Sequence, residues 1–167
     1  GKEFDIGRGL FPPLVEKDLP IYAQNRFSNW TDIGRVSDYW SVCQRVLRCE
    51  VAQMHMPGKE VRPGVWVGLN TRIDWDNVSI EGPVYIGSGV CVEPGVKIVG
   101  PSWIGHGSLL RKNSQVVRSV LFEYTRLGEN TVFDEVVASP VYVVNRHGQT
   151  IYQGDESTYL RWGDARA

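Results

Sequence analysis

The chain has 167 residues, of which 42% are hydrophobic and 22% charged, and this composition is typical of one globular domain with at most an appendage. Eighteen lysines and arginines against nineteen aspartates and glutamates give a formal charge of -1, which leaves no basic surplus to neutralise a nucleic-acid backbone. No apolar run approaches the roughly 20 residues of a membrane span and no signal-peptide pattern opens the chain, so we expect a cytoplasmic protein with neither nucleic-acid nor membrane partners.

The first part of the chain predicts little regular structure apart from one helix. Residues 1–29 are interrupted by prolines, and we expect them to be extended and to lack a core of their own. Apolar residues then recur with helical spacing from Tyr39 to Leu47, after Ser37 as a candidate N-cap, which predicts an amphipathic helix over 37–49. The three cysteines form no CxxC pair, so neither a disulfide framework nor a zinc site is expected from Cys43, Cys49 and Cys91.

A six-residue repeat dominates the middle of the chain. Apolar residues, nearly all aliphatic, recur at every sixth position, with one extra residue before Ile80 and a slip back by one residue near Phe122. They are Val61, Val67, Ile73, Ile80, Ile86, Val92, Ile98, Ile104, Leu110, Val116 and Phe122, then Leu121, Leu127 and Phe133. Most are followed four positions later by a small or β-branched residue, Val120 and Val137 among them. Such a period drifts around an α-helix, but it suits short strands, on which alternate side chains share a face, joined by two-residue corners.

The repeat therefore predicts a coiled parallel β-solenoid. Gly82-Pro83 and Gly100-Pro101 recur at a spacing of eighteen residues, which indicates three strands per coil and about four coils between Val61 and Val137. The same alternation puts Trp66, Tyr85 and Trp103 in one outward column, with Leu121 next in line. Such a column predicts either a docking surface for the helix or the tail, the interpretation we favour, or an interface between subunits.

The end of the chain predicts a cap. Residues 141–144 and 150–152 alternate as strands do and surround Asn145-Arg146-His147-Gly148, which is typical of a β-hairpin. A hairpin at this position would cover the open edge of the last coil.

Two family resemblances give these elements a context. The hexad run resembles the left-handed β-helix of hexapeptide-repeat proteins, and this resemblance supplies the hand of the coil. The segment from Phe4 to Leu47 resembles the end of the catalytic domain of sugar-phosphate nucleotidylyltransferases, mannose-1-phosphate guanylyltransferase in particular, which leads into a hexapeptide-repeat domain. The residues that carry the second resemblance are Phe4-Asp5-Ile6-Gly7, Leu10-Phe11-Pro12, Leu14-Val15, Leu19-Pro20-Ile21-Tyr22, Trp30-Thr31-Asp32-Ile33-Gly34 and Asp38-Tyr39.

The resemblance implies a fold and a domain order. The fold is mainly β, a single-stranded left-handed parallel β-helix preceded by a short α/β remnant with one amphipathic helix. Residues 1–56 would be the remnant of the catalytic domain, 57–140 the β-helix, and 141–167 the capping hairpin and tail. Because the chain begins at Gly1, we expect it to be the C-terminal piece of a longer protein.

The resemblance also implies a function. The longer protein would form an NDP-sugar of the GDP-mannose type from a nucleoside triphosphate and a sugar 1-phosphate. Asp32 would help to hold its Mg²⁺, a hard cation that prefers carboxylate and phosphate oxygens. The chain by itself contains no Gly-rich nucleotide loop and no second metal-binding aspartate, so we expect it to be inactive and without a cofactor. Its β-helix would serve packing and homo-oligomer formation.

Hexapeptide-repeat acyltransferases are the alternative. Those enzymes use a histidine as general base toward acyl-CoA, and His106, in Ile104-Gly105-His106-Gly107, is the candidate. It lies at a predicted corner, where a solvated turn residue is the commoner explanation. A third possibility is a scaffold without catalysis.

Overall fold

The structure is a computed structural model that describes residues 4–24, 30–153 and 161–166. The chain divides into two compact units, residues 1–30 and 31–167. No helix in the described ranges is both long and apolar enough to cross a membrane.

The first unit contains helical turns where an extended chain was expected. A short π-helical turn, η1 (Ile6–Leu10), leads into α1 (Phe11–Glu16), and none of the residues in either is buried. The expectation of an extended segment was wrong here because Pro12 and Pro13 fall in the first turn of α1. Backbone N–H groups have no intrahelical partner at those positions, so proline costs the helix nothing.

The amphipathic helix of the second unit is α2 (Val36–Leu47). It begins one residue before Ser37 and ends two before the predicted boundary at residue 49. Ser37 is not its cap, because Arg35 holds the extended N-cap position without a side-chain hydrogen bond. Asp38 in the first turn stabilises the start of the helix through the helix dipole.

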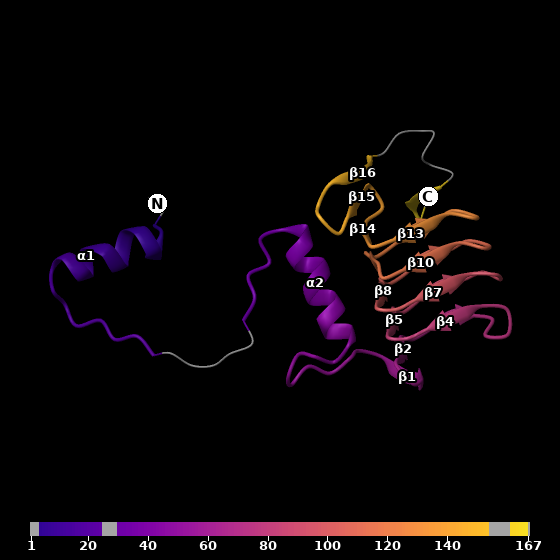
Figure 1. The fold of residues 1–167 in the computed structure, drawn as a ribbon, viewed down its shortest axis with the longest axis horizontal. Helices are drawn as coiled ribbons and strands as arrows, with labels where there is room; N and C mark the ends of the chain where they lie inside the picture. The colour runs from indigo at the N-terminus through magenta and orange to yellow at the C-terminus, as the bar shows by residue number, and fades with distance from the viewer. Residues whose placement is uncertain (1–3, 25–29, 154–160, 167) are drawn as a thin grey trace. The chain divides into compact units, whose positions relative to one another are not determined.

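The predicted solenoid is confirmed, as a left-handed β-helix of about four coils whose strands stack into three parallel sheets. Figure 1 shows the strands of successive coils one above another, with α2 alongside. The first sheet contains β2 (Val65–Val67), β5 (Val84–Ile86), β8 (Ser102–Ile104), β11 (Val120–Leu121) and β14 (Val136–Ala138). The second contains β3 (Arg72–Ile73), β6 (Cys91–Val92), β9 (Leu109–Leu110) and β12 (Thr125–Leu127), and the third β4 (Ser79–Glu81), β7 (Lys97–Val99), β10 (Gln115–Val117) and β13 (Val132–Asp134).

The inward side chains of the hexads form the core. Ile86, Ile104 and Leu110 are fully buried at 0% exposure, as the repeat predicts. Each such side chain contributes about 2 kcal/mol of hydrophobic stabilisation, and vertical stacking makes the contribution cumulative along the coils.

The register slip is real, and it corrects two predicted positions. Trp103 pairs with Tyr85, eighteen residues earlier, but with Val120 only seventeen residues later. The corner before Ser102 has two residues, Gly100 and Pro101. The matching corner in the next coil has one residue, Arg118, with φ 43°. Val120 therefore occupies the position in the outward column that was expected for Leu121, and Leu121 lies in the core. Ser119 takes the inward position that was predicted for Val120.

Antiparallel strands close both ends of the first sheet. At the start, β1 (Lys59–Arg62) pairs antiparallel with β2. Val61, expected as the first hexad residue, is 44% exposed, because Pro63-Gly64, with Gly64 at φ 72°, reverses the chain instead of turning a coil corner. At the other end, β15 (Tyr142–Asn145) pairs with β14 and with β16 (Thr150–Gln153), which confirms the capping hairpin.

A further antiparallel strand was not predicted. β17 (Trp162–Asp164) pairs with β12 and brings Trp162, 3% exposed, onto the end of the core. The Trp162 indole N–H donates to the carbonyl of Ser139, at 2.5 Å.

The helix α2 packs against the solenoid, while its docking on the column of Trp66, Tyr85 and Trp103 stays a prediction. α2 contacts β8 and β14. The Trp40 Nε1–H donates to the carbonyl of Arg118 at 2.9 Å, and the Tyr39 ring meets the Phe122 ring edge-on, with centroids 5.6 Å apart. Since Arg118 is the residue that makes the short corner, the slip in the repeat also provides the anchor for the helix.

Candidate functional site

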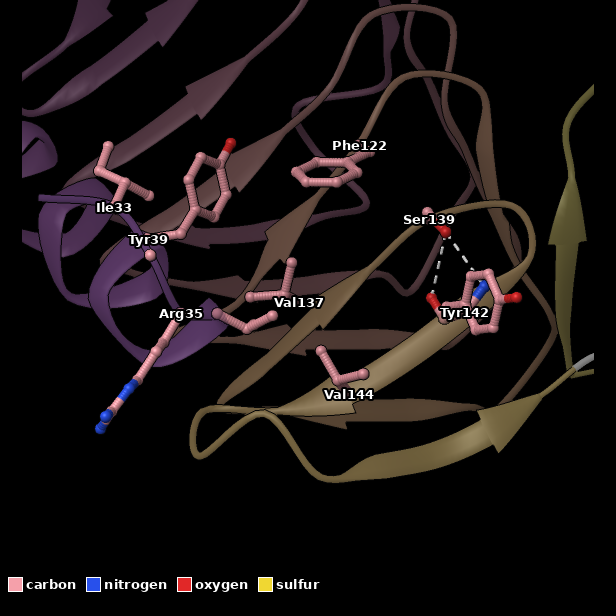
Figure 2. Close-up of a pocket in the computed structure, with 10 residues that line it drawn as sticks. Ile33, Arg35, Tyr39, Phe122, Val137, Ser139, Tyr142 and Val144 are labelled. Carbon is pink, nitrogen blue, oxygen red and sulfur yellow. Dashed lines mark hydrogen bonds between the residues drawn. The ribbon is translucent and has the colours of Figure 1, made fainter. Parts of the chain in front are cut away.

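The segment that carries Asp32 borders an apolar cavity. Residues 31–35 lead into α2, and Ile33, Arg35 and Val36 line a cavity of about 490 Å³ between the start of the helix and the strands β14 and β15. Val137 and Val144, which are cross-strand partners, lie opposite. Figure 2 shows the side chains of the loop, the helix and the hairpin around this space.

The walls of this cavity carry little charge. Burial and the neighbouring Cys43 thiol raise the pKa of the Tyr39 phenol far above its ordinary value of 10.0, so this ring stays neutral. The Ser139 hydroxyl is engaged with the backbone of Tyr142, whose N–H donates to it at 3.0 Å. Figure 2 shows the guanidinium of Arg35 directed away from the other labelled side chains. The cavity is therefore suited to apolar contacts, and none of its described lining residues is a carboxylate, a histidine or a lysine.

Asp32 itself is exposed and is not among the residues that line the cavity. Among the described residues, no group of three or more histidine, cysteine, aspartate or glutamate side chains is placed to hold a metal ion. One exposed carboxylate does not supply the ligand set of a Mg²⁺ site. The residues described here therefore do not form that site by themselves.

The geometry of His106 does not favour a general base. It is an exposed corner residue, and its Nδ1 accepts the backbone N–H of Ser88 at 2.8 Å. A neutral imidazole whose Nδ1 accepts must carry its proton on Nε2, which then donates and cannot take a proton from a substrate. No carboxylate of the described residues is hydrogen-bonded to the ring. His106 thus lies at a corner, as the sequence predicts, but its described hydrogen bonds are not those of a general base.

The three aromatic residues form one column, as the alternation predicts. Trp66 pairs with Tyr85 and Tyr85 with Trp103 across parallel strands. The rings of Tyr85 and Trp103 are in contact, with centroids 4.1 Å apart. Tyr85 is buried, whereas Trp66 and Trp103 are partly exposed. These residues and His106 lie more than one coil below the hairpin that lines the apolar cavity.

The sequence did not predict the apolar cavity. Val137 was expected to face inward, and Phe122 was counted in the hexad series before the slip. The slip puts Phe122 at a corner, 36% exposed. A second one-residue corner, at Glu135 with φ 52°, turns Val137 outward. Alternating apolar residues in the hairpin, Tyr142 and Val144, were the one available signal that its outer face packs against something.

Comparison with known proteins gives the chain relatives. No family model matches it. It is 46% identical over 151 residues to UTP--glucose-1-phosphate uridylyltransferase of Synechocystis, a match that includes 90% of this chain and 39% of that protein. It is also 25% identical over 151 residues, 84% of the chain, to glucose-1-phosphate adenylyltransferase of Bacillus anthracis, and 25% identical over 128 residues to that of Clostridium kluyveri.

The chain spans between 30% and 39% of the length of these three relatives. All three transfer a nucleotidyl group to a sugar 1-phosphate by name. The similarity includes most of the chain in each case, so the chain is homologous to the sugar-phosphate nucleotidylyltransferases and corresponds to less than half of such a protein.

Proposed function

We propose that the chain is the C-terminal portion of a nucleotidylyltransferase that forms UDP-glucose from UTP and glucose 1-phosphate. The observation that carries this proposal is the 46% identity to the Synechocystis uridylyltransferase over 90% of the chain. The adenylyltransferases are 25% identical to the chain, which supports the same class of reaction. The lower identity gives ATP weaker support than UTP as the nucleotide. The guanylyl and mannose type expected from the sequence finds no support among these relatives.

We propose that the chain contributes structure rather than chemistry to this enzyme. Catalysis of nucleotidyl transfer depends on positioning and charge stabilisation around the phosphates, and the described residues offer no cluster for that task. The β-helix and α2 would form a rigid block that packs against the catalytic part and takes part in oligomer formation. The chain alone would make no NDP-sugar.

Asp32 is our candidate for a contribution to metal binding in the longer protein. A Mg²⁺ ion in such an enzyme would neutralise phosphate charge during the transfer. Asp32 lies exposed a few residues before the start of α2, so its carboxylate is available to a neighbouring domain. The further carboxylate and phosphate oxygens that Mg²⁺ prefers would come from outside the described residues.

The reaction is tested on the longest reading frame that contains this chain. Pyrophosphate release is measured with UTP and glucose 1-phosphate, with ATP and glucose 1-phosphate, and with GTP and mannose 1-phosphate. The first pair is expected to give the highest kcat/KM. A folded long protein that releases pyrophosphate with none of the pairs would overturn the proposal, and a preference for another pair would overturn its UTP and glucose part.

The role of Asp32 is tested in the same long protein. Asp32→Asn is expected to lower kcat and to raise the Mg²⁺ concentration needed for half-maximal rate, because one anionic ligand is lost. Asp38→Asn, which removes an aspartate six residues further along, is the matched control and is expected to leave the Mg²⁺ dependence unchanged. An unchanged Mg²⁺ dependence in Asp32→Asn would remove Asp32 from the site.

The acyltransferase alternative has a separate test. Acetyl transfer releases the free thiol of CoA, which is measured with a thiol reagent in the presence of candidate hydroxyl and amine acceptors. We expect no thiol release, since an imidazole whose Nδ1 accepts the Ser88 N–H carries its proton on Nε2 and is not a base. Acceptor-dependent thiol release that His106→Asn abolishes would favour the acyltransferase.

A further inference from the structure

A second cavity, separate from the apolar one, lies at the corners that follow β2, β5 and β8. It encloses about 660 Å³, and its lining includes Lys59, Trp75, Tyr85, Ser88, Trp103 and His106. This volume is in the range of cavities that hold small molecules. None of these residues has a part in the reaction proposed above, so the inference that follows does not depend on it.

Three rings of this cavity are held in fixed mutual positions. The parallel register of β5 and β8 stacks Tyr85 against Trp103, with ring centroids 4.1 Å apart and planes inclined by 42°. The imidazole of His106 meets Tyr85 edge-on, with centroids 6.4 Å apart and planes at 83°. Tyr85 is only 2% exposed, so Trp103 and His106, which contact it, are the two of these rings that a ligand can reach. A rigid aromatic wall of this kind suits the flat face of a ring-shaped ligand.

The polar groups of the cavity are mainly hydrogen-bond donors. His106 accepts the Ser88 N–H through Nδ1, which leaves Nε2 as a donor. The Ser88 oxygen accepts the Leu69 N–H at 3.0 Å, so its own hydroxyl hydrogen remains to be donated. Lys59 forms no ion pair with any described residue. No aspartate or glutamate is among the described lining residues.

A cavity rich in donors and without carboxylates favours a ligand rich in acceptors. Phosphate oxygens are such acceptors, and charge-assisted hydrogen bonds from an ammonium group make them strong partners. We propose that this cavity binds a phosphate ester carried on a sugar ring, with the ring against Trp103 and the phosphate toward Lys59 and the Nε2–H of His106. Sugar phosphates and nucleotides share this chemistry.

Binding is measured on the 167-residue chain by isothermal titration calorimetry. The probes are glucose 1-phosphate, UMP, glucose, uridine and inorganic phosphate, so that the ester, the ring and the base are compared one at a time. At least one of the two phosphate esters is expected to bind saturably, and at least about tenfold more tightly than its neutral counterpart and than inorganic phosphate. The ester that binds more tightly identifies the source of the phosphate.

Two substitutions test the donors without removing the fold. His106→Asn keeps an acceptor for the Ser88 N–H and deletes the distal donor, and it is expected to weaken binding about tenfold. Lys59→Met keeps the length of the side chain and deletes the charge, with a similar expected loss. His147→Asn, in the hairpin loop, and Lys97→Met, on β7, are the matched controls and are expected to bind as the unchanged chain does.

Three results would overturn the proposal. These are the absence of saturable binding of either ester to a chain that melts normally, binding of inorganic phosphate as tight as that of the esters, and equal losses in the site variants and their controls. Because the chain alone is expected to lack nucleotidyl transfer, the binding experiment and the activity of the longer protein can fail independently.

Discussion

Replacement of Trp40 by phenylalanine tests how α2 is held on the solenoid. Phenylalanine retains most of the ring contacts but cannot donate a hydrogen bond, so the carbonyl of Arg118 loses its 2.9 Å partner. A lost hydrogen bond costs about 1 kcal/mol, and incomplete hydration of a partly buried carbonyl adds to the cost. We expect Trp40→Phe to lower the free energy of unfolding by about 1–2 kcal/mol.

The measurement is equilibrium urea unfolding followed by far-UV circular dichroism. With a urea dependence of about 2 kcal/mol per M, the midpoint should fall by roughly 0.5–1 M. Trp30→Phe is the control, because Trp30 is 77% exposed, and its midpoint should stay unchanged. Trp40→Ala should lose about 2 kcal/mol more, since it also removes the ring. An unchanged midpoint in Trp40→Phe together with a large fall in Trp40→Ala would refute the role of the hydrogen bond.

Three further predictions concern buried and closely packed groups. Gln44→Met should raise the melting temperature, because both polar atoms of the Gln44 amide are buried without a partner among the described atoms; a fall would show that the amide is hydrogen-bonded, for example to internal water. Burial raises the pKa of the Cys43 thiol above its ordinary value of 9.0. Because the thiolate is the nucleophile, a thiol reagent at pH 8 should label exposed Cys49 faster than Cys43. The labelling rate of Cys43 should still rise with pH above pH 9. Equal labelling rates at pH 8, read by peptide mass mapping, would contradict this. Gly105→Ala should destabilise the fold by about 2–3 kcal/mol, because its Cβ would lie 2.5 Å from the backbone of the next coil, whereas Gly34→Ala, whose nearest contact is 3.8 Å away, should have little effect on the urea midpoint.

The repeat predicted the solenoid because its signal is cumulative. Ile86 and Ile104 need only be apolar at a fixed spacing, and every coil repeats the same requirement. The strands that close the ends lie outside the repeat and have no such support. A hairpin turn at Gly64 and a coil corner contain the same residue types, so the antiparallel β1 could not be distinguished from another hexad.

The cavities were less predictable because they depend on single-residue register and on contacts between distant segments. Whether Val120 or Leu121 faces outward depends on one residue omitted from the corner at Arg118. A one-residue shift exchanges the two faces of a strand. The prediction of the aromatic column is right up to Trp103, because the register is regular there. It is wrong at Leu121, because that residue lies beyond the slip.

The length of α2 is close to the height of the first sheet. Its 12 residues span about 18 Å at 1.5 Å per residue. The distance from β2 to β14 is four interstrand spacings, or about 19 Å. The helix and the first sheet are therefore nearly equal in length. One more coil would make the sheet longer than the helix by one strand spacing, unless the helix gained about three residues. Coil number and helix length should therefore change together during the divergence of such chains.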